Sequence, residues 1–252
     1  MYKIAIATMK GGVGKTATTH ALATALADKY RVLMVDIDPQ SSLTASCGHQ
    51  AGEASLAAVL DGEMKINEIL VEVAPNLWLA PADIALATTE LFITARMGRE
   101  NLLHRALKDV GGEFDLCLID SPPSLGLLTV NALRTATAVL IPTIPQITDL
   151  RGLNLFMGTL NQIRVELNPE LEVMGILPTF FDGRLIHHRE AIEVMREAGL
   201  PLLEVRIGRS VRVAEAAAGG ESVVTYDPQN KQAKAYRQLA EEVDQWLKDE
   251  LE

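Results

Sequence analysis

The sequence predicts an α/β protein with a doubly wound, mostly parallel sheet of about seven strands and helices on both faces. Short runs rich in Ile, Val and Leu alternate along the chain with amphipathic segments of helical length. These runs contain few polar residues, as is typical of strands covered on both faces. A glycine-rich segment between the first strand pattern and the first helix pattern completes the arrangement of a P-loop NTPase fold.

The expected elements follow in chain order, and glycines or prolines mark many of their boundaries. The expected strands are residues 3–8, 32–36, 77–80, 116–120, 138–142, 173–177 and 203–207. The expected helices are residues 15–27, 84–110, 149–166, 185–198 and 231–251, and Gly98 marks a point where the second could break. Ligands of such sheets bind at the carboxyl ends of the strands, so residues just after each strand are the candidates for a site.

Composition limits the classes of function. The chain has 252 residues, which suits one domain or at most two small ones. Its formal net charge of -10 argues against a general nucleic-acid binder, although a local basic patch is compatible with it. No apolar run is long enough to span a bilayer. The spacing of Cys47 and Cys117 fits no zinc or haem pattern, and both suit a reduced cytoplasmic setting.

The strongest motif is the phosphate-binding loop after the first strand, where Lys10-Gly11-Gly12-Val13-Gly14-Lys15-Thr16 matches the Gly-Lys-Thr end of the common pattern. Glycines let backbone N–H groups turn toward phosphates, and the following helix presents its positive end to the anion. Lys15 can neutralise phosphate charge, and the Thr16 hydroxyl can bind Mg²⁺. The alternative is a glycine-rich turn without a ligand, which the order of strand, loop and helix disfavours.

Two further motifs place carboxylates at strand ends. Asp36 and Asp38 stand in the segment Asp-Ile-Asp-Pro-Gln after the second strand. Asp120 ends an apolar strand and precedes Ser-Pro-Pro, which is the Walker B pattern for a residue that holds Mg²⁺ through water. Either segment alone could be a solvated loop, but both follow strands of the same predicted sheet edge.

The second lysine of the loop, Lys10, together with D-x-D-P-Q and D-x-P-P, makes the sequence resemble the ParA/MinD family of deviant Walker A ATPases. The likeness covers nearly the whole chain and is greatest to the short Soj-like and small plasmid ParA forms. It implies that Lys10 and Lys15 are catalytic, with Lys10 reaching the ATP of a partner in a nucleotide-sandwich homodimer. It also implies that Asp38 positions the attacking water, while Thr16, Asp36 and Asp120 serve Mg²⁺.

The resemblance also marks positions near the rest of the nucleotide. Ala17 stands where many members have a threonine at the α-phosphate, and Gly208 and Ser210 replace a proline and an asparagine beside adenine. Arg184 and Arg212 match positions implicated in DNA contact, and the neighbouring Arg209 could enlarge that patch. The alternative is that these are ordinary surface arginines, some of them paired with glutamates such as Glu215.

The function implied by the resemblance is an ATP-dependent switch for chromosome or plasmid partition, formed by residues 1–252 as a single domain without an N-terminal helix-turn-helix domain. Such a switch would bind ATP or ADP with Mg²⁺, bind DNA non-specifically as an ATP-bound dimer, and hydrolyse ATP slowly until a ParB-like partner stimulates it. It would be cytoplasmic and associated with the nucleoid. Alternatives are a positioning scaffold for a protein cargo, a membrane-associated MinD-like ATPase, and a metabolic synthetase of the same superfamily. The acidic segment 237–252 argues against membrane binding.

Overall fold

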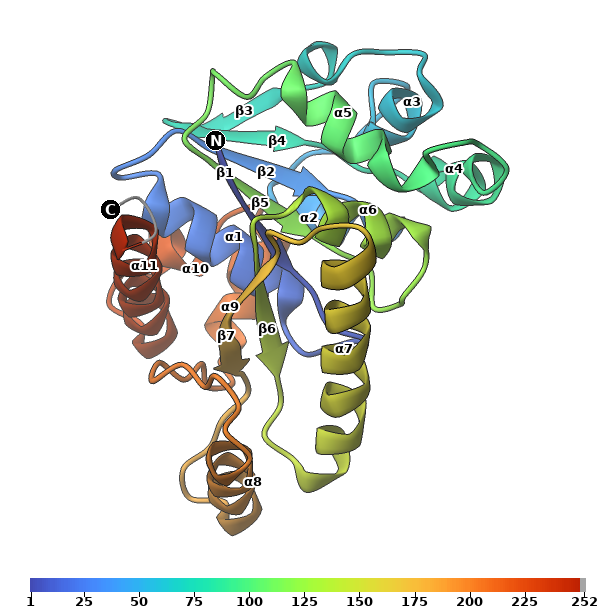
Figure 1. The fold of residues 1–252 in the computed structure, drawn as a ribbon. Coiled ribbons are helices and arrows are strands. Elements are labelled where there is room, and N and C mark those ends of the chain that lie inside the picture. Colours follow the sequence, from blue (N-terminus) through green and yellow to red (C-terminus); the bar gives the residue numbers. More distant parts are fainter. Residues whose placement is uncertain (250–252) are drawn as a thin grey trace.

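The computed structural model describes residues 1–249, which form one seven-stranded sheet between two layers of helices (Figure 1). The strand order is β3-β4-β2-β5-β1-β6-β7. The strands are β1 (Tyr2–Ile6), β2 (Val32–Asp36), β3 (Val71–Ala74), β4 (Leu77–Ala80), β5 (Leu116–Asp120), β6 (Ala138–Thr143) and β7 (Glu172–Pro178). All neighbouring strands are parallel except β3 and β4. The predicted doubly wound, mostly parallel sheet is therefore confirmed.

One predicted strand is absent and one observed strand was not predicted, so the number of strands agrees. The segment 203–207 is not a strand, because beyond an isolated bridge between Ile176 and Leu202 its backbone does not pair regularly with β7. The missed strand is β3, a four-residue edge strand that pairs antiparallel with β4 after a turn in which Asn76 has a φ of 59°. Such a short, half-exposed edge strand lacks the apolar run by which the buried strands were recognised.

The helices follow the predicted order with additions. They are α1 (Lys15–Leu26), α2 (Ser42–Ser46), α3 (Leu56–Asp61), α4 (Ala85–Ile93), α5 (Leu102–Lys108), α6 (Leu127–Thr135), α7 (Ile147–Glu166), α8 (Ile186–Glu197), α9 (Val211–Ala218), α10 (Val223–Tyr226) and α11 (Lys231–Asp249). The expected helix 84–110 is broken at Gly98, whose φ of 66° is left-handed, so α4 and α5 are separate. The helices that were not predicted, α2, α3, α6, α9 and α10, have nine residues or fewer.

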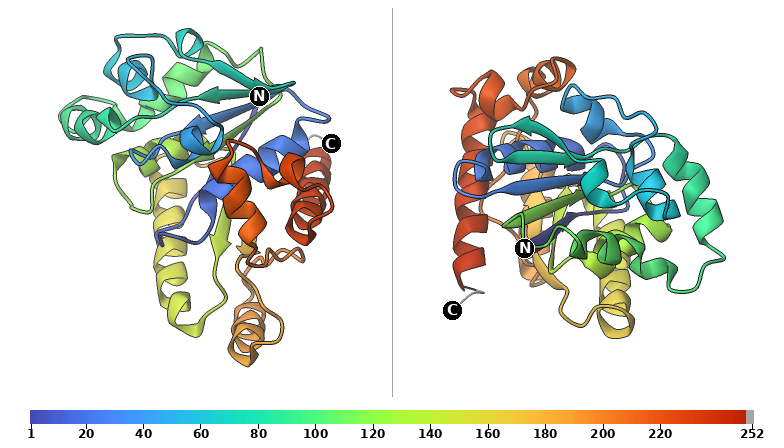
Figure 2. Two further views of the ribbon diagram at one scale, coloured as in Figure 1. Left: turned by 180° about the vertical axis from the view of Figure 1, so that it is seen from behind. Right: turned by 90° about the horizontal axis from the view of Figure 1, so that it is seen from above.

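Apolar side chains on the two faces of the sheet meet different helices, and Figure 2 shows helices on both sides. On one face, Ile4 and Ile6 pack with α1 and α11. On the other face, β2 and β5 pack with α3, α5 and α6, while β6 packs with α7. Cys117 is completely buried in this second layer. Because helices cover both faces of the central strands, a ligand reaches these strands at their ends and not at their faces.

Helix α11 belongs to the core. Tyr236, Leu239 and Leu247 are buried against α1 and the sheet, and Trp246 packs edge-on against Tyr2. The last two residues of the expected helix 231–251 lie outside the described residues. No helix within residues 1–249 combines the length and the apolar character needed to cross a bilayer.

The loop that follows β5 is tied to α4 by one carboxylate. Glu90 on α4 accepts a hydrogen bond from the backbone N–H of Leu128, at the start of α6, over 3.2 Å. A Cβ atom placed at Gly126 would lie 2.3 Å from Glu90 Oε1, so any other residue at position 126 would displace the Glu90 carboxylate. Helix α4 therefore contacts the segment that connects Asp120 to α6.

Candidate nucleotide-binding site

The phosphate loop lies between the carboxyl end of β1 and the amino end of α1. Gly12 and Gly14 have φ values of 71° and 89°, a conformation that glycine adopts without strain. Helix α1 begins at Lys15, and the Lys15 ammonium folds back to donate to the Lys10 carbonyl oxygen over 3.4 Å. Burial lowers the pKa of Lys15, and the nearby Asp120 and Asp38 carboxylates oppose this shift. The Lys15 ammonium and the amino end of α1 thus face the same space beside the loop. Two positive groups in this position suit a phosphate.

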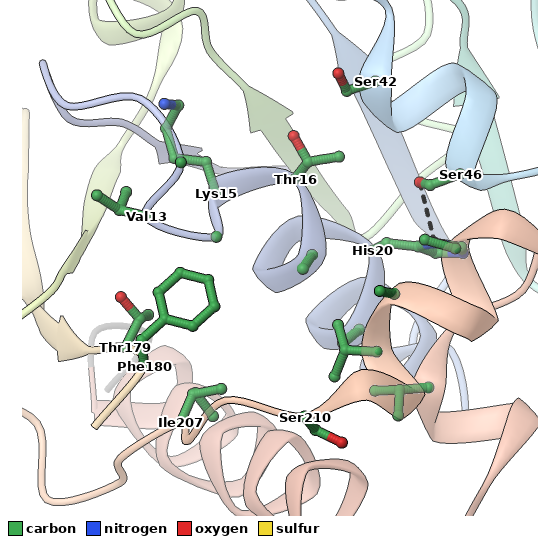
Figure 3. Close-up of a pocket in the computed structure, with 18 of the residues that line it drawn as sticks. Val13, Lys15, Thr16, His20, Ser42, Ser46, Thr179, Phe180, Ile207 and Ser210 are labelled. Atoms are coloured by element: carbon green, nitrogen blue, oxygen red, sulfur yellow. Dashed lines mark hydrogen bonds between the residues drawn. The ribbon is translucent and has the colours of Figure 1, made fainter. Parts of the chain in front are cut away.

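A cleft of about 520 Å³ begins at this loop and runs between α1 and the segment that leads into α9 (Figure 3). Most of the predicted nucleotide-binding residues line it together: Gly11, Gly12, Val13, Gly14, Lys15, Thr16, Ala17, Gly208 and Ser210. Asp38 also lines it. A cleft of this size suits a nucleotide.

Lys10 does not line this cleft. Its ammonium makes a 2.6 Å ion pair with Asp149 in the first turn of α7, and the Lys10 side chain is 46% exposed. The pair borders a smaller hollow beside the phosphate loop, formed with residues of β6 and α7. Within one chain, Lys10 is therefore directed away from the phosphate position.

Asp120 lies directly beneath the loop, almost completely buried. The Thr16 hydroxyl donates to one of its carboxylate oxygens over 2.7 Å, and the Thr19 hydroxyl donates to the other over 3.3 Å. Burial, reinforced by the nearby Asp36 carboxylate, raises the pKa of Asp120 to about 8. A cation bound beside Thr16 would favour the ionised carboxylate.

This donor set fits Mg²⁺ held mainly by phosphate and water. No group of three His, Cys, Asp or Glu side chains within residues 1–249 is arranged to hold a metal. Mg²⁺ commonly keeps several waters and takes only one or two protein ligands beside phosphate oxygens. Thr16 and Asp120, in contact at the end of the phosphate loop, supply a hydroxyl and a carboxylate of that kind.

The other two aspartates have different surroundings. Asp36 is fully buried and accepts hydrogen bonds from both the backbone N–H and the hydroxyl of Thr44, each over 2.8 Å. Burial raises the pKa of Asp36 to about 6 despite these bonds. Asp38 faces the cleft and accepts from the Gln40 N–H over 2.9 Å. Asp36 thus ties α2 to the end of β2, which leaves Asp38 as the carboxylate directed at the ligand space. Sequence reasoning missed Thr44, because no local pattern marks it.

At the far end of the cleft, the residues that replace the family's adenine contacts are used by the protein itself. The Gly208 N–H donates to Gln232 Oε1 over 2.7 Å, and the Ser210 hydroxyl caps α9 by accepting from the Arg212 N–H over 3.2 Å. Phe180 and His20 also line the cleft, and neither was a predicted site residue.

The predicted DNA-binding arginines are exposed but differ in their partners. Arg184 pairs with Asp182 over 2.7 Å, and Arg212 pairs with Glu215 over 2.8 Å. Arg209 makes no ion pair within the described chain, and its guanidinium lies 5.3 Å from the centre of the Phe180 ring. Two of the three are therefore partly neutralised, and the third stands at the mouth of the cleft.

Comparisons with known proteins, by sequence and by structure, point to one protein family. A family model described as an AAA domain matches residues 1–173. The chromosome-partitioning ATPase Soj of Thermus thermophilus is 40% identical over 96% of this chain and 94% of its own length. The sporulation initiation inhibitor protein Soj of Bacillus subtilis is 37% identical over 95% of this chain and 97% of its own length.

Solved structures agree in fold. A protein from Mycobacterium smegmatis described as cobyrinic acid a,c-diamide synthase, with bound ADP and magnesium, has a TM-score of 0.85 and 36% identity over 95% of this chain and 92% of its own. The septum site-determining protein MinD from Pyrococcus horikoshii, complexed with Mg-ADP, has a TM-score of 0.81 and 27% identity over 98% of this chain and 97% of its own. With the phosphate loop, the paired strand-end carboxylates and these relatives in agreement, the chain belongs to the ParA/MinD family of ATPases.

Proposed function

We propose that this chain is an ATP-driven partition switch that binds ATP with Mg²⁺ and hydrolyses it. The observation that carries the proposal is the phosphate loop, where the buried Lys15 ammonium and the Thr16–Asp120 pair converge at the amino end of α1. Relatives that contain ADP with magnesium support the choice of ligand. Relatives named for chromosome partitioning, at 38–40% identity over nearly their whole length, favour this role over the synthase named for one structural relative.

Each residue near the cleft has a distinct proposed role. The backbone N–H groups of residues 11–16 and the Lys15 ammonium hold the phosphates, and Thr16 and Asp120 hold Mg²⁺. Asp38 lines the cleft and orients the attacking water, so that hydrolysis depends on geometry and charge that the fold supplies. Asp36 acts through Thr44 by holding α2 against the end of β2. Asp38→Ala should bind ATP but not turn it over, and normal phosphate release by this variant would refute the role of Asp38.

The ATP-bound form is proposed to be a homodimer in which Lys10 acts on the nucleotide of the second copy. Lys10 lies outside the cleft of its own chain and is half-exposed, so it is available to a partner once the contact with Asp149 breaks. A second cation at the transferred phosphoryl group would stabilise the transition state as an arginine finger does. Slow hydrolysis by single chains would follow from the absence of that cation.

We further propose that the dimer binds DNA non-specifically in the cytoplasm, on the nucleoid, and that a ParB-like protein stimulates hydrolysis and releases it. Arg209 is the strongest candidate among the arginines because it is exposed and makes no ion pair in residues 1–249. Two copies of the chain would double the local positive charge, and the affinity would fall steeply with salt. The segment 237–252, with six acidic and two basic residues, gives no reason to invoke a membrane.

A positioning scaffold for a protein cargo is the second candidate. Two observations favour it, the net charge of -10 and the pairing of Arg184 and Arg212 with carboxylates. In this case ATP would drive dimerisation in the same way, but the dimer would hold a protein and not DNA.

One experiment separates the two candidates. Binding to a non-specific duplex is measured by fluorescence anisotropy with ADP, with ATP, and with ATP at raised salt, alongside dimerisation. Binding only with ATP, lost at high salt and in Arg209→Glu but kept in the charge-matched control Arg164→Glu on α7, supports the partition switch. ATP-dependent dimerisation without DNA binding in any state would replace it by the scaffold.

A further inference from the structure

The backbone of Phe180 is strained at the edge of the cleft. Its φ of 49° is left-handed, and it is one of three non-glycine residues of this kind in the described chain, with Ser41 and Asn76. Serine and asparagine enter this region in turns at modest cost, whereas a bulky aromatic residue there is an outlier. Strain of this kind persists where the surrounding structure holds a residue for a purpose. Phe180 stands two residues after the end of β7, where ligands of such sheets bind.

The strained backbone places the ring inside the cleft, between the phosphate loop and Ile207 (Figure 3). A Cβ atom placed at Gly14 would lie 3.8 Å from Phe180 Cε2, so the outer edge of the ring approaches the loop closely. The Arg209 guanidinium covers the ring at 5.3 Å from its centre, a cation–π arrangement that holds it from the solvent side. The ring is therefore fixed from two directions, next to the position of the phosphates.

Several polar groups around the ring are already satisfied by the protein, whereas the buried Thr179 hydroxyl has no hydrogen-bond partner within residues 1–249. Gly208 donates its N–H to Gln232, and Ser210 accepts from the Arg212 N–H. Both ring nitrogens of His20 lie within reach of side chains, at 3.3 Å from the Ser46 hydroxyl at the end of α2 and 3.7 Å from the thiol of Cys47, which follows α2. The cleft is also lined by the apolar residues Ala17, Ala21, Ile207, Val213, Ala214 and Ala217, and by the polar residues Thr179, Glu221 and Ser222. Such a surface offers packing, and few free hydrogen-bonding groups, to a ligand.

We propose that Phe180 is the base-binding wall of this cleft and that the purine of the bound nucleotide packs against its ring. The proposal rests on the proposed function, because the phosphate loop sets the position of the nucleotide. Base–aromatic packing would take the place of the side-chain contacts that Gly208 and Ser210 do not supply. It depends on the stacking area of the base, so a purine gains more from it than a pyrimidine.

The test compares three ligands on the full chain by isothermal titration calorimetry, with Mg²⁺ present: ATP, UTP and tripolyphosphate. Phe180→Ala and Phe180→Gly remove the ring, and the glycine variant also accepts the positive φ without strain. Phe180→Tyr keeps the ring. Phe181→Ala is the matched control, because the Phe181 ring lies outside the cleft against His188 and Arg206.

Both ring-deleting variants should bind ATP about five- to 150-fold more weakly, the loss expected for one base–aromatic contact. Their preference for ATP over UTP should shrink, while Phe180→Tyr and Phe181→Ala keep the affinity for ATP. Binding of tripolyphosphate should be unchanged in all variants, since it has no base. Unchanged or tighter ATP binding in Phe180→Gly would overturn the proposal and show the ring to be a plug that the base displaces. Absence of both tripolyphosphate and ATP binding in the unaltered chain would instead refute the proposed function.

Discussion

Replacing Asp149 with asparagine should strengthen ATP-dependent dimerisation. In the single chain, the Asp149 carboxylate holds the Lys10 ammonium at 2.6 Å, and this pair must break before Lys10 can reach a second copy. The Lys10 side chain is 46% exposed and that of Asp149 is 13% exposed, so the pair is worth about 0.2–1 kcal/mol, as for other solvent-accessible ion pairs. A symmetric dimer breaks two such pairs, so the cost is at most about 2 kcal/mol.

The expected result follows from that cost. Asp149→Asn should raise the association constant of the ATP-bound chain by about two- to thirtyfold, and the gain should shrink at high salt because ions screen the pair. The measurement is sedimentation equilibrium with ATP, in an Asp38→Ala background to slow hydrolysis. Asp28→Asn is the control, since it makes the same change of charge at an exposed site remote from Lys10. A constant equal to that of the control, or a weaker dimer, would refute the reasoning, and a weaker dimer would place Asp149 in the interface.

Three further predictions concern the cleft and its supports. Lys15→Ala should abolish binding of both ATP and tripolyphosphate in calorimetry, because the buried ammonium is the loop's main positive charge, and retained tripolyphosphate binding would contradict that role. Since burial raises the pKa of Asp120, the folded chain keeps a proton that the unfolded chain has released, so the free energy of unfolding without ligand should fall as pH rises from about 4 to about 8. Urea titrations across this range should show a smaller slope in Asp120→Asn, and an equal slope would assign the effect to another group. Gly208→Ala should lower the free energy of unfolding by about 1–3 kcal/mol, because the new Cβ would lie 2.9 Å from Gln232 Nε2; urea denaturation showing no loss would mean that Gln232 moves freely.

The buried strands could be predicted because their residues report burial directly. In β2 and β5 every residue is buried, and each stood out as an unbroken apolar run ending in aspartate. The errors in the predicted strands occur where apolar content and strand pairing do not coincide. The segment 203–207 has the apolar content of a strand but runs past the edge of β7, and β3 is a strand with an exposed side. Local pattern does not distinguish a segment that pairs from one that lies alongside a sheet.

The residues of the candidate site also fall into those that the sequence predicted and those that only the structure shows. The phosphate loop was recognisable because its function requires particular residues at fixed spacing in one continuous stretch. The contact between Thr16 and Asp120 joins residues 104 positions apart, yet both carried a motif of their own. Thr44, Gln232 and Phe180 carried none, because their roles depend on which groups the folded chain brings to Asp36, Gly208 and Gly14. Their assignment needed three-dimensional structure.

The hydrogen bond between Glu90 and the start of α6 links the position of α4 to the segment that follows Asp120. Only residues 121–126 separate Asp120 from the helix whose first turn Glu90 holds. On its outer side α4 carries Leu91 and Phe92, 76% and 69% exposed. A displacement of α4 would act on the Glu90–Leu128 hydrogen bond and, through it, on the short, proline-containing loop that follows Asp120. A contact made on the exposed face of α4 would therefore lie one hydrogen bond and one short loop away from Asp120.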